Sequence, residues 1–275
     1  MNMDLLNKYN ELKKYLESFG SIAVAFSSGV DSTFLLYAAK EALGDKAIAI
    51  TAVADAFPER EMREADEYCK KMGIRHFQVR VDQFAIDGFS ENPKNRCYLC
   101  KRGLFQEIIA VARSQGIIEI AEGSNLDDNG DYRPGLQAVA ELNIKSPLRY
   151  VGFTKQEIRD LSEYFHIPTW NKPSFACLAS RFPYGDAITH EKLRMVDKGE
   201  QLLMDMGFSQ FRVRIHGDVA RIELLPTEFD RFMSENIRQE VYETFKEYGF
   251  SYVALDIYGY RTGSMNENIE SNRPQ

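Results

Sequence analysis

A short polar loop near the start of this 275-residue chain has the residue types and spacing to bind a phosphate. Apolar residues at 22–26 predict a strand buried on both faces of a parallel sheet. The run Ser27-Ser28-Gly29-Val30-Asp31-Ser32 follows at once, and an apolar helix begins at Phe34. A tight loop that enters a helix presents backbone N–H groups and the positive end of the helix dipole. This arrangement favours an anion, above all a phosphate.

The loop differs from two familiar phosphate loops, because the sequence contains neither Gly-x-x-x-x-Gly-Lys-Ser/Thr nor Gly-x-Gly-x-x-Gly. It resembles the Ser-Gly-Gly-x-Asp-Ser loop of the ATP pyrophosphatase superfamily, whose enzymes split ATP between its α- and β-phosphates. Ser27, Gly29, Asp31 and Ser32 match that pattern, whereas Ser28 replaces a glycine. A serine accepts fewer turn geometries than glycine does. The alternative is an ordinary helix N-terminus, since Ser and Asp are common caps.

An acidic loop follows the strand predicted at 117–121. It comprises residues 123–128, with the sequence Gly-Ser-Asn-Leu-Asp-Asp, and then Asp131-Tyr-Arg-Pro-Gly135. Asp127, Asp128 and Asp131 have the oxygen ligands that Mg²⁺ prefers, and Mg²⁺ would neutralise a pyrophosphate leaving group. We expect Asp128 and Arg133 to contribute to the nucleotide site, and a solvated acidic loop is the alternative.

Three of the four cysteines form a candidate metal site. Cys97 and Cys100 make a Cys-x-x-Cys pair just before a predicted helix, and Cys177 lies between two predicted domains. The fourth, Cys69, belongs to an apolar helical stripe and is expected in the core. No further Cys or His stands at zinc spacing, so three thiolates suit a 4Fe-4S cluster whose fourth iron can hold an external sulfide. Zinc with an external ligand and unligated thiols are the alternatives.

A predicted β-hairpin carries arginines on one face. Residues 211–224 alternate strictly between apolar and polar, and Gly217-Asp218 forms the turn. This register places Arg214 opposite Arg221 and Arg212 opposite Glu223. Two arginines facing each other cost stability unless an anion lies between them, so Arg212 and Arg214 are expected to bind a substrate phosphate. The alternative is a solvated face in which Glu223 or Glu200 compensates the charge.

The predicted elements that position these residues form two domains. Strands at 22–26, 47–53, 76–81 and 117–121 alternate with helices, which predicts an α/β doubly wound parallel sheet with ligands at the carboxyl ends of its strands. From Thr189, a helix, the hairpin, a second helix and a last strand predict a smaller α+β domain. We expect domains at 1–178 and 179–263 and a disordered polar tail at 264–275.

Composition narrows the possible partners. The net charge is −7 and no Lys/Arg-rich patch is present, so nucleic acid is not expected as a partner. No apolar run approaches a membrane span, and the polar first residues differ from a signal peptide, which predicts a cytoplasmic protein without membrane contact. Few cysteines in a reducing compartment favour thiol or metal chemistry over disulfides.

Four segments together carry a more specific resemblance. They are Ser27 to Ser32, Asp131-Tyr-Arg-Pro-Gly135, Ser180-Arg-Phe-Pro-Tyr-Gly185 and Arg212-Val-Arg214. They resemble the ATP-dependent sulfur transferases of the lactate racemase nickel-pincer cofactor pathway, over about residues 20–265. The resemblance implies that a carboxylate of pyridinium-3,5-biscarboxylic acid mononucleotide is adenylylated and converted to a thiocarboxylate. Some members sacrifice a cysteine sulfur, at the position of Ala176 here, whereas this chain is similar to members with three cysteines and a cluster.

The resemblance also implies a division of roles. ATP binds over Ser27 to Ser32, with Mg²⁺ on Asp31 and Asp128. Sulfide from the cluster, or a Cys177 thiolate or persulfide, displaces AMP from the acyl-adenylate. Ser180 and Arg181 are placed to stabilise the charged intermediate, and an interdomain structural link is the alternative for Arg181.

The expected partners are therefore the mononucleotide and inorganic sulfide or another sulfur donor, and a homo-oligomer is expected. Three alternatives share part of the pattern: a tRNA thiolase with the same nucleotide loop, an amidating synthetase that uses ammonia, and a nucleotide-binding module with a structural metal.

Overall fold

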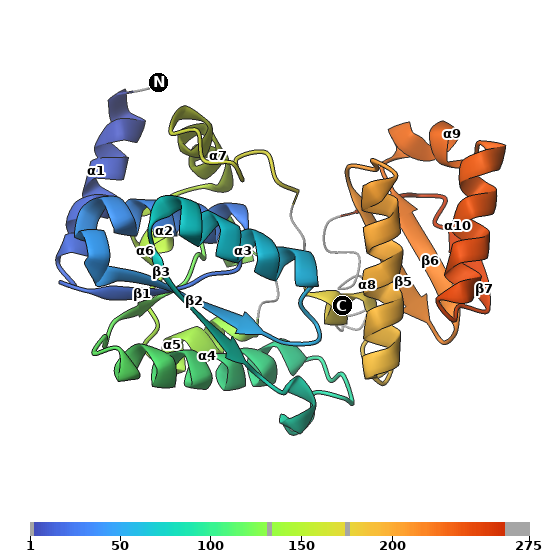
Figure 1. Cartoon of the computed structure of the whole chain (residues 1–275), viewed down its shortest axis with the longest axis horizontal. Coiled ribbons are helices and arrows are strands. Elements are labelled where there is room, and N and C mark those ends of the chain that lie inside the picture. Colours follow the sequence, from blue (N-terminus) through green and yellow to red (C-terminus); the bar gives the residue numbers. More distant parts are fainter. Residues whose placement is uncertain (1–2, 131–133, 174–176, 262–275) are drawn as a thin grey trace, which may run out of the picture. The chain divides into compact units, whose positions relative to one another are not determined.

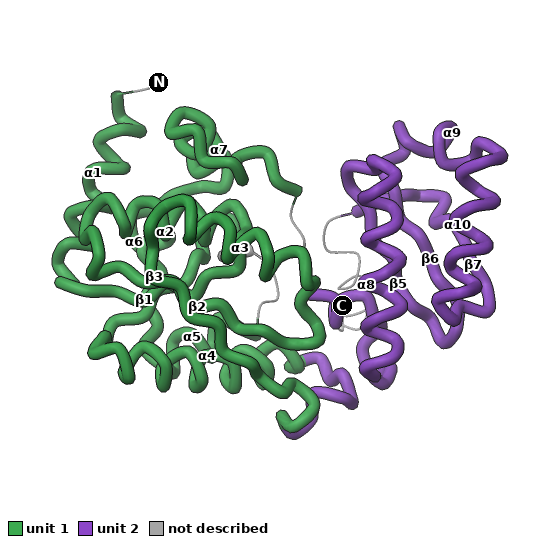
Figure 2. The backbone as a smooth tube through the Cα atoms, viewed as in Figure 1, with its two compact units in different colours: residues 1–86, 95–175 green, residues 87–94, 176–275 purple. Residues whose placement is uncertain are grey.

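The computed structural model describes residues 3–130, 134–173 and 177–261. The chain forms two compact units, residues 1–86 with 95–175 and residues 87–94 with 176–275 (Figure 2). The sequence alone did not indicate that residues 87–94 belong with the second unit. There the Asn92 side chain donates a 2.6 Å hydrogen bond to the carbonyl oxygen of Pro183. The tail at 264–275 lies outside the described residues.

The first unit is built on a parallel sheet, four-stranded within the described residues (Figure 1). Its strands are β1 (Ile22–Ala25), β2 (Ala47–Val53), β3 (Arg75–Arg80) and β4 (Ile120–Ala121), in the order β3-β2-β1-β4. In the centre, Val24 of β1 lies opposite Ala49 and Ala121. Small and β-branched residues tolerate burial on both faces, which explains why β1 is central.

Helices cover both faces of this sheet, which confirms the doubly wound arrangement (Figure 1). They are α1 (Met3–Glu17), α2 (Val30–Leu43), α3 (Glu59–Met72), α4 (Arg96–Ser114), α5 (Gly135–Glu141), α6 (Pro147–Val151) and α7 (Lys155–Tyr164). One apolar core joins the sheet to α1, α2, α3, α6 and α7, and the other joins it to α4 and α5. The alternation of side chains along β1 sends Val24 to the first core and Ala23 to the second.

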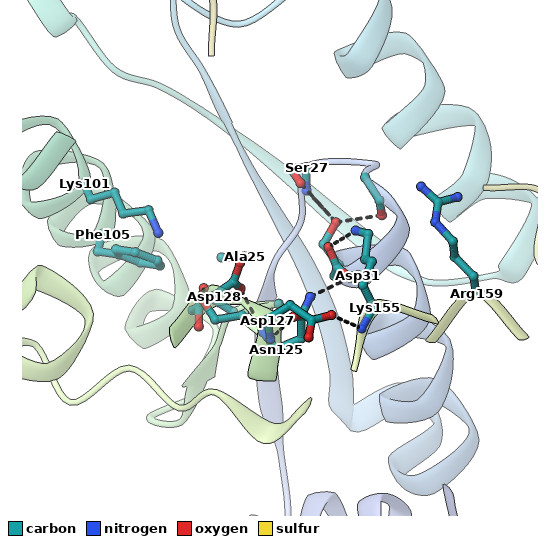
Figure 3. Close-up of a pocket in the computed structure, with 15 residues that line it drawn as sticks. Ala25, Ser27, Asp31, Lys101, Phe105, Asn125, Asp127, Asp128, Lys155 and Arg159 are labelled. Atoms are coloured by element: carbon teal, nitrogen blue, oxygen red, sulfur yellow. Dashed lines mark hydrogen bonds and ion pairs between the residues drawn. The ribbon is translucent and has the colours of Figure 1, made fainter. Parts of the chain in front are cut away.

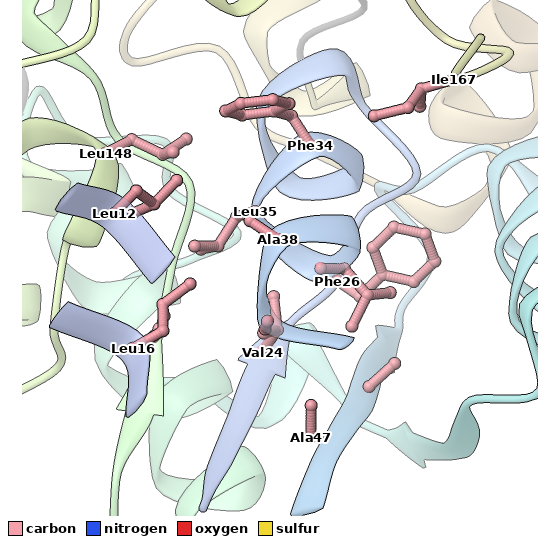
Figure 4. Packing of buried hydrophobic residues seen from close by; sticks show 14 of the residues in the cluster. Leu12, Leu16, Val24, Phe26, Phe34, Leu35, Ala38, Ala47, Leu148 and Ile167 are labelled. Atoms are coloured by element: carbon pink, nitrogen blue, oxygen red, sulfur yellow. The ribbon is translucent and has the colours of Figure 1, made fainter. Parts of the chain in front are cut away.

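The core beneath α2 fixes the helix that follows the polar loop. Phe34 and Leu35 are fully buried and pack with Val24 of β1 and Leu12 of α1 (Figure 4). Cys69 of α3 is also fully buried in this cluster, which confirms its expected place in the core. Burial of large apolar side chains around α2 therefore anchors the start of the helix, and with it the loop.

Two helices begin earlier than the sequence predicted. Helix α2 begins at Val30, because the Thr33 amide already donates to the carbonyl oxygen of Gly29 at 3.0 Å. Helix α4 begins at Arg96, so Cys97 and Cys100 lie in its first turns and not before it. Of the described residues, none belongs to a helix that is long and apolar enough to cross a membrane.

The second unit is a small α+β arrangement, as predicted. It contains α8 (His190–Asp205), β5 (Phe211–His216), β6 (Val219–Leu224), α9 (Phe229–Phe232), α10 (Glu235–Glu247) and β7 (Tyr252–Leu255). The sheet order is β5-β6-β7, with β5 and β6 antiparallel and β6 and β7 parallel. The hairpin register is the predicted one, with Arg214 opposite Arg221 and Arg212 opposite Glu223.

Candidate functional site

The loop between β1 and α2 forms one wall of a pocket of about 560 Å³ in the first unit (Figure 3). Ser27, Gly29, Asp31 and Ser32 line it. Hydrogen bonds within the loop hold its shape, because the Ser32 hydroxyl lies 3.0 Å from the Ser27 hydroxyl and 3.3 Å from the Ser27 amide. The loop therefore lies at the carboxyl end of the central strand and at the N-terminus of α2, where an anion is favoured.

Two predicted loop residues do not line the pocket. Val30 is 4% exposed and packs into the core. Ser28 is 1% exposed, and its hydroxyl lies 2.8 Å from Oε2 of Glu61 on α3. Its φ of 51° is in the left-handed region that favours glycine. The serine that stands in place of the expected glycine thus adopts a backbone conformation that favours glycine.

The segment after β4 forms the opposite wall. Gly123 lies against the start of α2, where an added Cβ would stand 3.0 Å from the Ser32 amide nitrogen. A glycine is therefore required for this close approach. Hydrogen bonds fix Asn125 and Asp128 in this wall. The Asn125 side chain donates to Oδ1 of Asp31 at 3.2 Å, and the backbone N–H of Asn125 donates to Oδ2 of Asp128 at 2.9 Å.

Three acidic side chains lie at this end of the sheet. Asp31, Asp127 and Asp128 all line the pocket, as Figure 3 shows. Their carboxylates, with the side chain of Asn125 between them, are the hard oxygen donors that suit Mg²⁺. Within the described residues, no three acidic, cysteine or histidine side chains lie close enough together to hold a metal ion, so Asp31 and Asp128 as ligands of a metal that accompanies ATP stay a prediction. Arg133 and Asp131 lie outside the described residues.

Sequence reasoning missed the cations of this pocket. Lys101, Lys155 and Arg159 line it, and Nζ of Lys155 lies 2.5 Å from Oδ2 of Asp31. The spacing of two of these cations was one signal that could have found them. Lys155 and Arg159 are four residues apart, which places them on the same face of a helix. Lys101 comes one residue after Cys100, on the same helix as the cysteine pair. The pocket therefore combines carboxylates for a metal with cations for phosphates.

Cys97 and Cys100 lie three residues apart in α4, each with a donor directed at its sulfur. The Gln83 side chain donates to Sγ of Cys100 at 3.0 Å, and the Arg96 guanidinium donates to Sγ of Cys97 at 3.6 Å. Arg96 and Gln83 are 2% and 1% exposed. Buried donors of this kind orient the sulfurs, and two cysteines three residues apart can serve as ligands of a metal or cluster. Cys177 is half-buried in the second unit, and the shared three-cysteine site stays a prediction.

A buried ion pair organises the predicted catalytic residues of the second unit. Arg181 donates to both carboxylate oxygens of Glu200, at 2.6 and 2.9 Å, and its guanidinium lies 2.7 Å from the Ser180 hydroxyl. Arg181 is 1% exposed and Glu200 is fully buried. Burial favours the neutral acid, but the charge of Arg181 and its hydrogen bonds outweigh it and lower the pKa of Glu200. Both members of this ion pair lie in the second unit.

The hairpin arginines are compensated inside the protein. Oε1 of Glu223 accepts hydrogen bonds from Arg214 at 2.6 Å and from Arg221 at 3.0 Å. Glu223 thus compensates both charges inside the protein, so no external anion is needed to separate these two arginines, and phosphate binding by Arg212 and Arg214 stays a prediction. The face is buried, however, and not solvated as the alternative from the sequence assumed, since Arg212 and Arg214 are 5% and 8% exposed.

Positive charge still exceeds negative charge around this face. Arg181, Arg212 and Arg214 share the two buried carboxylates Glu200 and Glu223. Burial and the neighbouring charge of Arg181 lower the pKa of Arg212 to about 10. Arg212 is thus charged at neutral pH, and the cluster favours an anion.

The chain has relatives of similar length. It is 38% identical over 262 residues to an uncharacterised protein of Synechocystis, covering 95% of this chain and 98% of that protein. It is 33% identical over 266 residues to pyridinium-3,5-bisthiocarboxylic acid mononucleotide synthase of Lactiplantibacillus plantarum, covering 96% of each. Over 151 residues it is 27% identical to argininosuccinate synthase of Haloarcula marismortui, covering 51% of this chain and 36% of that enzyme. No family model matches the chain.

The match to the Lactiplantibacillus plantarum enzyme extends over almost the whole chain. The chain therefore belongs to the ATP-dependent sulfurtransferase family that includes pyridinium-3,5-bisthiocarboxylic acid mononucleotide synthase, within the ATP pyrophosphatase superfamily.

Proposed function

We propose that this enzyme converts a carboxylate of pyridinium-3,5-biscarboxylic acid mononucleotide to a thiocarboxylate, in the synthesis of a nickel-pincer cofactor. One observation carries the proposal: the 33% identity to the Lactiplantibacillus plantarum synthase extends over 96% of both chains. The pocket at the β1–α2 loop supports the proposal. Its phosphate-binding loop, the wall with Asp127 and Asp128, and the two cations of α7 suit a nucleoside triphosphate.

ATP would bind with its phosphates over the loop. Backbone N–H groups at the start of α2 and the side chains of Lys155 and Arg159 would stabilise the negative charge that develops on pyrophosphate. Asp31 and Asp128 would hold Mg²⁺, which supplies further charge neutralisation when bound. The residues of this chain thus bind and orient ATP so that its α-phosphorus is open to attack.

The reaction has two steps. A carboxylate oxygen of the substrate attacks the α-phosphorus, the bond to the oxygen that bridges to the β-phosphate breaks, and pyrophosphate leaves. Hydrosulfide then attacks the acyl carbon, the bond from that carbon to the adenylate oxygen breaks, and AMP leaves with the former carboxylate oxygen. The hydrosulfide proton passes to solvent. Adenylylation is needed because a bare carboxylate resists nucleophiles.

The arginines of the second unit are proposed to bind the phosphate of the mononucleotide. Arg212 and Arg214 belong to a buried cluster with an excess of positive charge, and guanidinium groups match phosphate geometry. The Ser180 hydroxyl, held by Arg181, is proposed to face the same ligand. Arg181 itself donates two hydrogen bonds to Glu200, so we assign it a role in positioning Ser180.

Cys97, Cys100 and Cys177 are proposed to hold a 4Fe-4S cluster. When bound, such a cluster supplies an iron without a protein ligand, which is able to carry the sulfide. Gln83 and Arg96 would hold the two sulfurs of α4 in place through their hydrogen bonds.

Pyrophosphate release tests the proposed function. Protein purified without oxygen is incubated with ATP, Mg²⁺ and sulfide, and either the mononucleotide, bulk tRNA or no acceptor is added. The proposal predicts pyrophosphate only with the mononucleotide, together with a product in which sulfur has replaced oxygen. Pyrophosphate with tRNA alone would indicate a tRNA thiolase, and none with any acceptor would indicate a binding module. Replacing sulfide by ammonia separates sulfur transfer from amidation.

A further inference from the structure

Ser28 has a backbone conformation that its residue type disfavours. Its φ is 51°, in the left-handed region that a residue with a side chain adopts at a cost and glycine adopts freely. The residue is 1% exposed, so the surrounding structure must hold it there. The observed contacts of Ser28 identify the groups that do so.

One of these groups is Glu61 of α3. The Ser28 hydroxyl lies 2.8 Å from Oε2 of Glu61 and 3.0 Å from its backbone carbonyl oxygen, and it donates its hydrogen to one of them. Either bond fixes the serine side chain against α3. The hydroxyl therefore points away from the pocket, and the loop gains an anchor that a glycine would not have.

The second group is Lys172. Its Nζ lies 2.6 Å from Oε2 of Glu61 and 3.1 Å from the backbone carbonyl oxygen of Ser28. The side chains of Lys172 and Glu61 are 14% and 15% exposed, so water screens these contacts only partly. The ammonium also offsets the partial negative charge of a carbonyl oxygen in the loop. Lys172 thus holds both the serine and the carboxylate that contacts it.

The segment that carries Lys172 is itself tied to the pocket. The guanidinium of Arg159, which lines the pocket, donates to the carbonyl oxygens of Trp170 and Lys172, at 2.5 and 2.9 Å. Residues 170–173 lead along the chain toward the second unit. The nucleotide loop and this connecting segment are therefore joined by Arg159 and Lys172.

We propose that Lys172 and Glu61 are positioning residues that do for this loop what a glycine does elsewhere in the superfamily. They hold Ser28 in its left-handed conformation, and they make the shape of the loop depend on the segment before the second unit. This inference rests on the proposed binding of ATP at the loop. It assigns neither residue to contact with the reacting atoms.

The test is a double-mutant cycle on nucleotide affinity. Lys172→Met, Ser28→Gly and the double variant are titrated with Mg²⁺ and a non-hydrolysable ATP analogue by calorimetry. With Ser28 present, Lys172→Met should weaken binding about tenfold, which corresponds to about 1.4 kcal/mol. In the Ser28→Gly background the same substitution should weaken binding less than about twofold, because glycine adopts the left-handed backbone without help.

Lys40→Met is the matched control. Nζ of Lys40 lies 2.8 Å from Asp45 and 3.0 Å from the carbonyl oxygen of Gly73, which also has a positive φ, of 61°. The Lys40→Met substitution removes a lysine contact with a carboxylate and one with a carbonyl oxygen, both away from the pocket. Nucleotide affinity should therefore not change. If Lys172→Met fails to fold, Glu61→Gln takes its place in the same cycle.

Two results would overturn the inference while ATP binding stands. One is a Lys172→Met protein that binds the analogue as tightly as the unmodified protein, and the other is an equal loss in both backgrounds. If the unmodified protein binds no nucleotide, the proposed function fails and this inference falls with it.

Discussion

Lys155 of α7 and Asp31 of α2 form an ion pair across the pocket, with Nζ 2.5 Å from Oδ2. The pair brings a cation and a carboxylate to the point where the phosphates of ATP and their metal would lie (Figure 3). Its two members have different expected roles, because Lys155 suits a phosphate and Asp31 suits Mg²⁺. Substituting them one at a time therefore separates these roles.

Asp31→Asn should reduce the rate of pyrophosphate release about 100-fold at saturating ATP, because a ligand of the metal is lost. Lys155→Met should act mainly by raising the KM for ATP, by about tenfold, since one charge-assisted contact is removed. Steady-state pyrophosphate assays over a range of Mg²⁺ and ATP measure both effects. Lys8→Met is the control, because Lys8 also pairs with a carboxylate of α7, at 2.7 Å, but does not line the pocket. Equal loss in the control would contradict the assignment.

The Arg181–Glu200 pair should dominate the acid stability of the second unit. The pKa of Glu200 is lowered in the folded protein, so its stabilisation is complete above the unfolded value, about 4.3, and is lost as the pH falls below it. Arg181→Met leaves a buried carboxylate unpaired and should destabilise the protein by about 3 to 5 kcal/mol at neutral pH. The difference in unfolding free energy between the two proteins should shrink toward pH 4, where Glu200 in the variant is protonated.

Urea unfolding of both proteins across that pH range measures the deficit. Arg181→Met combined with Glu200→Gln should recover much of the lost stability, since no charge is then left buried. A deficit that is the same at every pH, or that the second substitution does not reduce, would show that the ion pair is not its cause.

Arg214 and Arg221 share Glu223 and form a natural matched pair for testing phosphate recognition. Arg214→Ala should raise the KM for the mononucleotide about 10- to 100-fold, the loss expected for a charged hydrogen bond to phosphate. Arg221→Ala removes the other bond to Glu223 from a side chain that is 31% exposed, and should change KM by less than about threefold. Calorimetric titration with the mononucleotide checks the result. If both variants bind equally well, Arg214 does not hold the phosphate.

The four cysteines should divide into one inert thiol and three ligands. Burial, with the nearby charge of Asp66, raises the pKa of Cys69 to about 12, so this thiol is neutral in the folded protein. Cys69→Ala should keep the iron and labile sulfide content unchanged, whereas alanine at Cys97, Cys100 or Cys177 should remove most of both. Iron and sulfide analysis of protein purified without oxygen decides the matter. Full iron content in any of the three ligand variants would contradict the proposed cluster.

The sequence predicted what depends on local pattern. The alternation at residues 211–224 and the Gly217-Asp218 turn fixed the register of the hairpin, and the structure has that register pair by pair. The polar loop after β1 was likewise found where a buried strand meets an apolar helix. Both features follow from periodicity and turn chemistry, which act over a few residues.

Partners that are distant along the chain were beyond such reasoning. Lys172 meets Ser28 across 144 positions, and Lys155 meets Asp31 across 124. Nothing in the local sequence of a lysine indicates which carboxylate it will face after folding. The burial of the arginine face in the second unit was also missed: Glu200 and Glu223 were considered as compensating charges on a solvated face, whereas the structure buries both carboxylates with Arg212 and Arg214.

The central claim is that the substrate carboxylate is adenylylated, and oxygen labelling tests it most directly. The mononucleotide, labelled with ¹⁸O in its carboxylates, is converted with unlabelled ATP and sulfide, and the AMP is examined by mass spectrometry. Attack of the carboxylate on the α-phosphorus predicts one ¹⁸O in each AMP, together with a thiocarboxylate that has lost that oxygen. AMP without ¹⁸O, formed alongside thiocarboxylate, would contradict the account.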